Sequence, residues 1–152
     1  MVSIGSGKTP VSLRFENCRS IGDGNAGLYI HLGNNPEHAV TGSVAFVDCT
    51  IERAGGAGVL VIDKPADGCA VSLARCRIID PGVGNPTYPP AVFMATSEST
   101  RPLGGITFDD VLIRDARGGR PMALIDMAGG IGLRGVWGHS SSTGVEPGKP
   151  SS

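Results

Sequence analysis

The sequence predicts an all-β solenoid, in which short strands recur along one chain and stack on their predecessors. Three observations predict it. A strand motif recurs along the chain, each copy contains a sharp break in its alternation, and glycine and proline punctuate the segments between copies, with 24 Gly and 11 Pro in 152 residues. The glycines follow no three-residue period, which excludes a collagen-like chain.

The first two strands of each repeat come from one recurring motif. It reads VSLRFENC at 11–18, SVAFVDCTI at 43–51, AVSLARCRI at 70–78, GITFDDVLI at 105–113 and GIGLRGVWG at 130–138. Apolar residues alternate with polar or small ones in each copy, and the segments are too short and too rich in β-branched residues for a helix. The spacing is irregular, but the motif is not.

A one-residue corner separates these two strands. The corner positions are Asn17, Asp48, Arg75, Asp110 and Gly135. Four of the five are Asn, Asp or Gly, the residues that best tolerate a positive φ. One left-handed residue turns the chain and lets the side chains on both sides of the corner face the core.

A third strand follows each pair after a glycine-rich turn. It reads GLYI at 27–30, GVLVI at 58–62, AVFM at 91–94 and ALID at 123–126. If Leu28 and Ile30 point inward, Tyr29 and His31 point outward. The same register turns Leu60 and Ile62, and then Phe93, outward; such an apolar stripe suggests cover by a loop, a domain or a second subunit.

Three of the four cysteines share one phase of the repeat. Cys18, Cys49 and Cys76 therefore stack in one interior column, either as packed thiols or as neighbours within disulfide range. With Cys69 they form no C-x-x-C, and the three histidines, His31, His38 and His139, lie at no zinc-binding spacing. We predict no metal site from these residues.

Charge and hydropathy exclude several classes. The net charge is −1 and no basic stripe is visible, so the sequence gives no support for nucleic-acid binding. No apolar run is long enough for a membrane span. The start MVSIGSGKTP lacks the apolar stretch of a signal peptide and the first glycine of a P-loop. We expect a flexible lead-in at 1–10, one folded domain at 11–138 and a disordered Gly/Pro/Ser-rich tail at 139–152.

Two acidic segments suggest a catalytic or sugar-binding role, and each also has a purely structural explanation. Asp109 and Asp110 resemble a carboxylate pair, yet adjacent residues project differently and Asp110 occupies a corner. In the turn RDARGGRPM, Asp115, Arg117 and Arg120 form either a solvated ion cluster or a contact for an anionic sugar.

The unit V-x-F-x-N-C-x-I…G-x-x-G-L-x-I resembles the repeat of right-handed parallel β-helix proteins, the pectin-lyase-like superfamily, over residues 11–138. The resemblance implies a right-handed parallel β-helix of about four to five coils, a segment of a longer helix, on a cell surface or outside the cell. It implies a carbohydrate-active or carbohydrate-binding module; if the chain is an enzyme, it is a polysaccharide lyase or glycoside hydrolase, with Ca²⁺ as a possible cofactor. No catalytic motif of the family is present, so no catalytic residue is assigned. The candidate substrate-binding residues are Tyr29, His31, Asp63, Lys64, Tyr88 and Arg120.

A second function stays open, that of a non-catalytic scaffold such as a cell-surface or tail-fibre segment. The ends of a short solenoid expose strand edges, and the sequence shows no helix that caps them. We therefore expect either flanking coils or self-association. The two functions differ in one feature, because an enzyme needs carboxylates and a cation that converge on one groove.

Overall fold

The described part of the chain contains fourteen strands, and none of its residues is helical. The structure is a computed structural model. It describes residues 10–22, 24–31, 40–62, 68–85, 89–94, 105–116, 123–126, 132–134 and 137–140, with 92–94 and the last three ranges described by their backbone. Of the predicted lead-in at 1–10 and the predicted tail at 139–152, residues 1–9 and 141–152 lie outside these ranges.

Every third strand of the chain belongs to the same sheet, and neighbouring strands run parallel. The first-strand sheet contains β1 (Val11–Glu16), β4 (Gly42–Val47), β7 (Ala70–Ala74), β10 (Ile106–Asp109) and β13 (Gly132–Arg134). The second-strand sheet contains β2 (Arg19–Ile21), β5 (Thr50–Glu52), β8 (Arg77–Ile79), β11 (Leu112–Asp115) and β14 (Trp137–Ser140). The third-strand sheet contains β3 (Leu28–His31), β6 (Val59–Ile62), β9 (Ala91–Met94) and β12 (Ala123–Asp126).

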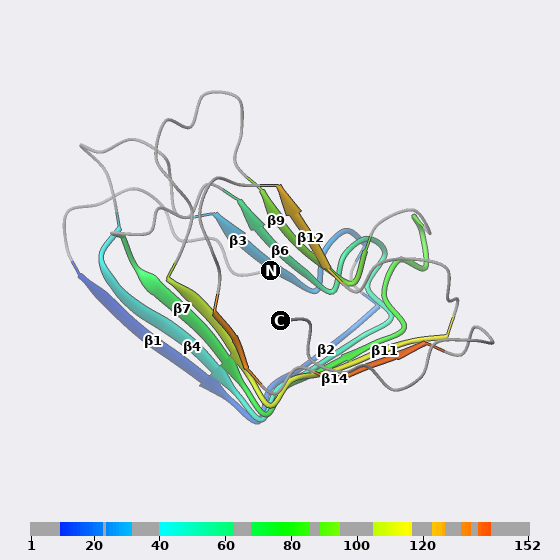
Figure 1. Cartoon of the computed structure of the whole chain (residues 1–152), viewed down its shortest axis with the longest axis horizontal. Helices are drawn as coiled ribbons and strands as arrows, with labels where there is room; N and C mark the ends of the chain where they lie inside the picture. The colour runs from blue at the N-terminus through cyan, green and yellow to red at the C-terminus, as the bar shows by residue number, and fades with distance from the viewer. Residues whose placement is uncertain are drawn as a thin grey trace.

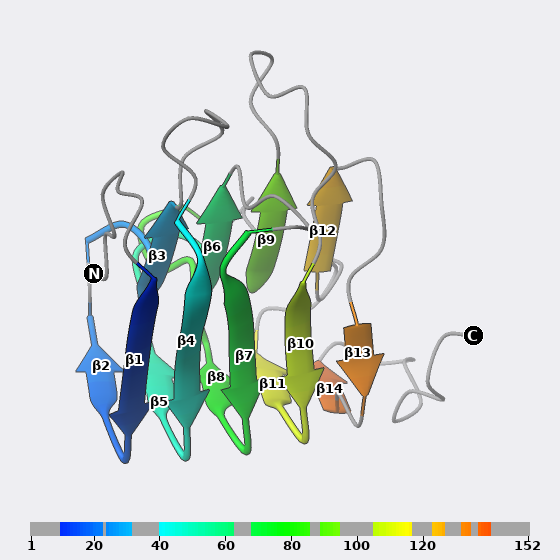
Figure 2. The same cartoon turned by 90° about the vertical axis from the view of Figure 1, so that its left-hand side faces the viewer.

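The three sheets surround a common interior. The first-strand and second-strand sheets meet along a sharp edge, and the third-strand sheet lies across from that edge (Figure 1). Successive repeats stand side by side from β1 to β13 (Figure 2). This all-β, parallel arrangement is consistent with a β-helix-like fold. β14 ends at Ser140, so the predicted domain boundary at 138 falls inside a strand.

The sharp edge is made by the predicted corner residues. Asn17, Asp48, Arg75 and Asp110 have φ angles of 54°, 53°, 52° and 54°, all in the left-handed region. The prediction is confirmed at all four positions, including Arg75, whose type favours this region least. The fifth position, Gly135, lies outside the described residues.

Backbone hydrogen bonds continue from repeat to repeat through the edge. The amides of Asn17, Asp48 and Arg75 donate to Val47 O, Ala74 O and Asp109 O over 3.0, 3.0 and 2.9 Å. Two residues past the corner the direction reverses, because Thr50 N and Arg77 N donate back to Cys18 O and Cys49 O of the preceding repeat, both over 2.9 Å. The turn therefore leaves no gap in the pairing of these strands, as buried backbone requires.

Side chains of like shape stack in columns inside the three sheets. Register places Phe15, Phe46, Leu73 and Phe108 in one column, and Phe46, Leu73 and Phe108 are fully buried. The rings of Phe15 and Phe46 are stacked, with centroids 5.0 Å apart and planes 11° from parallel. A second column of buried isoleucines, Ile51, Ile78 and Ile113, comes from the second-strand sheet.

The glycines before β3 and β6 are required by this second column. A Cβ on Gly58 would lie inside 3.0 Å of Ile78 Cγ2 and 3.1 Å from Pro90 O. Gly27 faces Ile51 in the same way one repeat earlier. The backbone of the third strand therefore packs directly on an isoleucine of the second-strand sheet, with no room for a side chain between them.

Candidate functional site

The outer surface of the third-strand sheet holds two of the predicted site residues. In β3, Leu28 and Ile30 are buried while Tyr29 and His31 are half-buried, which is the alternation the sequence predicts. The two rings meet edge to face, with centroids 6.5 Å apart and planes at 63°. Alternate positions of one short strand thus place a phenol and an imidazole on the same surface.

An apolar pair continues this surface in the next repeat. Register places Leu60 opposite Tyr29 and Ile62 opposite His31, and both aliphatic side chains are half-buried. The predicted outward orientation of Leu60 and Ile62 agrees with this register and burial. The surface therefore changes from aromatic in β3 to aliphatic in β6.

The prediction that Phe93 continues the outward stripe is wrong in register. Phe93 is the partner of Val61, a fully buried residue, and Val92 and Met94 are the partners of Leu60 and Ile62. The shift arises because β9 begins with Ala91 opposite Val59, one residue away from the expected alignment.

The structure does not describe the other four predicted site residues. Asp63, Lys64, Tyr88 and Arg120 lie outside the described residues. Asp109 and Asp110 lie at the end of β10 and at the edge between the other two sheets, and both are exposed. Asp110 has the corner conformation that the structural reading of this pair predicts.

Asp115 departs from its expected place. The sequence suggests a solvated ion cluster of Asp115 with Arg117 and Arg120, but the Asp115 side chain is only 1% exposed. It is the last residue of β11, where the strand's alternation turns it to the buried side after Ile113. The two arginines lie outside the described residues.

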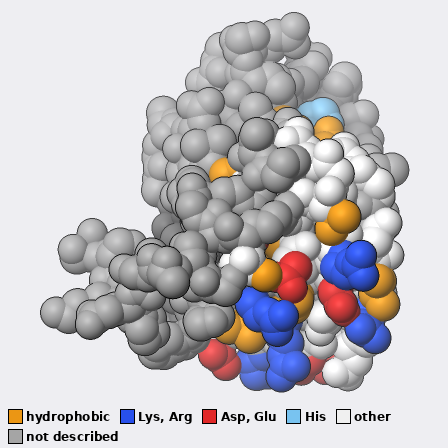
Figure 3. Space-filling view, turned by 90° about the vertical axis from the view of Figure 1, so that its right-hand side faces the viewer, with side chains coloured by type: hydrophobic (Ala, Val, Ile, Leu, Met, Phe, Trp, Pro, Cys, Tyr) orange, Lys and Arg blue, Asp and Glu red, His pale blue; other side chains and the backbone are white. Residues whose placement is uncertain are grey.

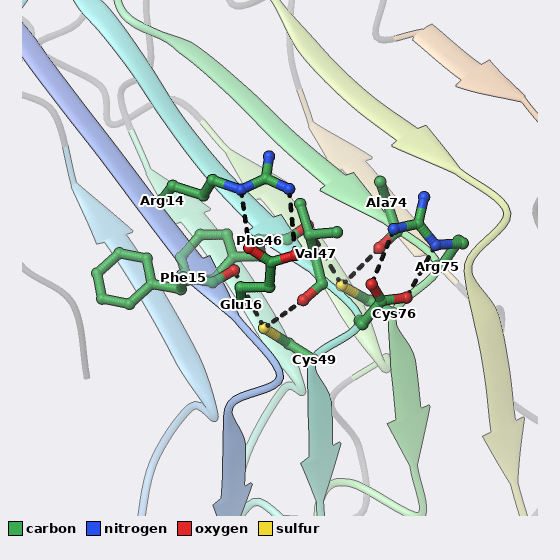
Figure 4. Close-up of polar contacts among 10 residues, drawn as sticks. Arg14, Phe15, Glu16, Phe46, Val47, Cys49, Ala74, Arg75 and Cys76 are labelled. Carbon is green, nitrogen blue, oxygen red and sulfur yellow. Dashed lines mark hydrogen bonds and ion pairs between the residues drawn. The ribbon is translucent and has the colours of Figure 1, made fainter.

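The cysteine column forms as predicted, except at its first member. Cys49 Sγ donates to Val47 O at 3.3 Å and to Phe15 O of the preceding repeat at 3.5 Å (Figure 4). Cys76 Sγ repeats the pattern with Ala74 O and Phe46 O, at 3.4 and 3.5 Å. Both side chains are buried, and all four cysteines are free thiols.

Cys18 is exposed, so the prediction that it is buried is wrong. Its Sγ makes the bond within its own repeat, to Glu16 O at 3.5 Å, and therefore points the same way as the other two. The difference is position, because Cys18 belongs to β1 and β2, the edge strands of their sheets. The position of a residue within its repeat predicts which way its side chain points. Burial of that side chain also needs a neighbouring repeat on each side.

Burial raises the pKa of the Cys76 thiol from 9.0 to about 11, because the thiolate loses its hydration in the interior. At neutral pH a thiol of this kind is a weak nucleophile. Cys76 is therefore a packing residue, as the sequence suggests for this column.

Ion pairs link neighbouring repeats at the surface. Arg75 makes a two-pronged pair with Asp48 at the edge, with both N–O distances 2.8 Å, and these hydrogen bonds lower the pKa of the Asp48 carboxyl. On the second-strand sheet, Arg19 contacts Glu52 at 2.6 Å and Arg114 contacts Asp80 at 3.3 Å. Each pair joins side chains from adjacent repeats, so each helps fix their alignment.

Sequence reasoning missed a second corner, which ends the strands of the second-strand sheet. Gly22, Arg53 and Asp80 follow β2, β5 and β8 with φ angles of 68°, 55° and 45°. A Gly or Asp four residues after the cysteine was the available signal in two of these repeats, and Arg53 interrupted it in the third. Beside this corner lies a hollow of about 430 Å³, to which Ile21, Arg53 and Val83 contribute.

Within the described residues, no group of three or more His, Cys, Asp or Glu side chains is arranged to hold a metal ion. Nor does any helix of that part of the chain have the length and apolarity to span a membrane. Comparison of the chain with protein-family models, curated proteins and solved structures returned no match.

Proposed function

We propose that this chain is a right-handed parallel β-helix segment of the pectin-lyase-like kind, with four to five coils, that binds a polysaccharide on its third-strand sheet. Three parallel sheets that each take every third strand, together with left-handed residues at the edge, support the proposed fold. The proposal places the chain outside the cell or on its surface, as a carbohydrate-binding or carbohydrate-active module within a longer helix.

The Tyr29–His31 pair carries the proposed function. Its two rings share one surface, and each offers an apolar face and one polar edge. Sugars present the same combination, with C–H faces bounded by hydroxyl groups. Because both side chains stand on a strand of the sheet, their positions are set by the backbone rather than by a loop.

Glycan-array binding of the full chain, followed by calorimetry with the best ligand, tests this function. Tyr29→Ala and His31→Ala should each weaken binding about tenfold, and Tyr29→Phe should keep most of it because the ring remains. Arg14→Ala, on the first-strand sheet, is the control. Runs with Ca²⁺ and with a chelator address the cofactor that the family resemblance implies. Equal affinity of Tyr29→Ala and the unaltered chain would exclude this surface.

A structural scaffold is the second candidate, and the apolar part of the same sheet favours it. Leu60 and Ile62 lie in register with Val92 and Met94, so the column next to the aromatic pair is aliphatic. Aliphatic surface suits contact with protein better than contact with sugar. Under this function sedimentation velocity shows self-association that Leu60→Lys reduces, and arrays and uronate-lyase assays stay silent. A monomer unchanged by Leu60→Lys would exclude it.

A further inference from the structure

The hollow beside the second corner has the volume of a small-molecule site. It lies where the second strands lead into their turns, and its volume is about 430 Å³. Three successive repeats contribute glycines to its lining, namely Gly24, Gly55 and Gly84. We call it the turn hollow. Its volume falls within the roughly 300–1,000 Å³ typical of sites for small ligands.

Hydrogen bonds between repeats hold the lining of the turn hollow in place. Gly82 N and Val83 N donate to Ala54 O over 2.7 and 3.0 Å, and Gly84 N and Asn85 N donate to Gly55 O over 2.9 and 2.8 Å. The glycines leave the space open, and a Cβ on Gly24 would meet no atom within 4 Å. The turn hollow is therefore formed before any ligand arrives.

Aliphatic side chains stand exposed at the turn hollow. Val83 and Ile21 are 57% and 55% exposed, the highest fractions among the large hydrophobic residues whose side chains are described. Ile21 ends β2 and Val83 lies in the turn after β8, two repeats further on, and both line the same space. Figure 3 views this side of the molecule and shows hydrophobic side chains intermixed with basic and acidic ones. An apolar ligand group between Ile21 and Val83 would remove both from water.

Arg53 brings to the turn hollow a positive charge that has no ion-pair partner among the described residues. The arginines at 14, 19, 75 and 114 all form ion pairs, whereas the described part of the chain provides none for Arg53. Glu52, beside Arg53 in the sequence, and Asp80, at the same corner of the next repeat, are engaged by other arginines. No described carboxylate therefore competes for the Arg53 guanidinium.

The backbone of Arg53 is also unfavourable for its type. Its φ is 55°, at a position where the neighbouring repeats have Gly22 and Asp80. A left-handed conformation costs a residue with a Cβ about 1–2 kcal/mol. Arg75 has the same conformation, but its guanidinium holds Asp48. At Arg53 this cost has no such compensation among the described residues, as is common where a residue serves a ligand.

We propose that the turn hollow binds a small organic carboxylate, with its apolar body between Ile21 and Val83 and its carboxylate on Arg53. A guanidinium matches a carboxylate with two parallel N–H···O bonds. The backbone of the turns provides the flat base on which the body lies. This site lies beside the second corner, apart from the Tyr29–His31 surface, and does not depend on the proposed polysaccharide function.

A methyl NMR titration of the full chain with hexanoate tests the proposal, with hexanamide as the uncharged control. Hexanoate should shift the Ile21 and Val83 methyl signals in a saturable way, and hexanamide should bind about tenfold more weakly because it lacks the charge. Acetyl-leucyl-glutamate, run in parallel, distinguishes a peptide carboxylate from a free acid. The absence of saturable shifts with every carboxylate up to about 20 mM overturns the proposal.

Three variants assign the binding to its residues. Arg53→Gly removes the charge and keeps the corner, since glycine occupies the equivalent position 22, and should weaken hexanoate binding about tenfold. Gly24→Leu should abolish binding because its side chain fills open space. Arg77→Gln, which removes another exposed arginine without a described ion pair, is the control and should bind as the unaltered chain does. Unchanged affinity in Arg53→Gly, or loss equal to it in Arg77→Gln, overturns the assignment.

Discussion

Gly58→Ala tests the packing that holds the third-strand sheet, and with it the Tyr29–His31 surface, against the second-strand sheet. The added Cβ falls inside 3.0 Å of Ile78 Cγ2 and 3.1 Å from Pro90 O. Carbon atoms prefer separations of about 3.5–4.0 Å, so a strand or a buried isoleucine has to move. Ile78 is fully buried and has little freedom to do so.

Two opposing effects set the change in the free energy of unfolding that Gly58→Ala causes. Overpacking of a dense core costs about 1–3 kcal/mol, and the loss of glycine's freedom in the unfolded chain returns about 0.4–1 kcal/mol. Gly58→Ala should therefore lower the free energy of unfolding by about 1–2 kcal/mol. For a chain of this length that corresponds to a fall in melting temperature of about 2–8 °C.

Urea unfolding followed by circular dichroism measures the change, and two further variants identify its cause. Gly24→Ala is the matched control, because its Cβ meets nothing within 4 Å, so it should be neutral or stabilise by up to about 1 kcal/mol. Ile78→Ala removes the clashing methyl group, so Gly58→Ala should cost clearly less in that background, where only the 3.1 Å approach to Pro90 O remains. Equal effects of the Gly58 and Gly24 substitutions, or an unrelieved cost beside Ala at 78, would refute the packing argument.

Further predictions follow from the interior columns and the edge. Phe46→Ala should cost about 3–5 kcal/mol in urea unfolding, and Phe15→Ala, in the same column but half-buried, clearly less; equal costs would contradict the column. Asp48→Gly should be about 1 kcal/mol more stable than Asp48→Ala, since both lose the same ion pair and only alanine strains the corner; the reverse order would contradict the left-handed φ. A thiol reagent should label Cys18 in the folded protein and leave Cys76 unmodified, which mass mapping decides. Because the pKa of Cys76 rises from 9.0 to about 11 on folding, the unfolded chain binds fewer protons than the folded one between pH 9 and 11, so stability should fall across that window; Cys76→Ala should flatten the fall, and an identical profile would argue against the burial.

Short-range chemistry explains what the sequence predicted well. Each corner, from Asn17 to Asp110, is signalled by its own residue type and by the break in alternation around it, and both signals are local. Arg75 could be predicted as a corner only because it occupies the same position in its repeat as Asp48 and Asp110. Its residue type alone would not have indicated a corner. The inward and outward assignments in β3 and β6 likewise follow from a two-residue period.

Relations between repeats explain what the sequence could not predict. Cys18 has the same phase as Cys49, yet its exposure depends on its place at the edge of the stack. The register of Phe93 depends on where β9 begins after a long turn. The turn hollow needs three turns from three repeats, and neither Arg53 nor Val83 belongs to a motif that would single it out.

The row of corner residues has a consequence for the order of the repeats. Asn17, Asp48, Arg75 and Asp110 follow one another along the edge, and Arg75 is attracted to the aspartate on either side. Removal of the repeat that carries Arg75 would bring Asp48 next to Asp110, where two like charges repel at the spacing of neighbouring strands, about 4.8 Å. The interior columns of Phe, Leu and Ile would accept such a shortened stack, because their members are interchangeable in shape. The edge charges would oppose it, and they therefore favour the observed order of the repeats.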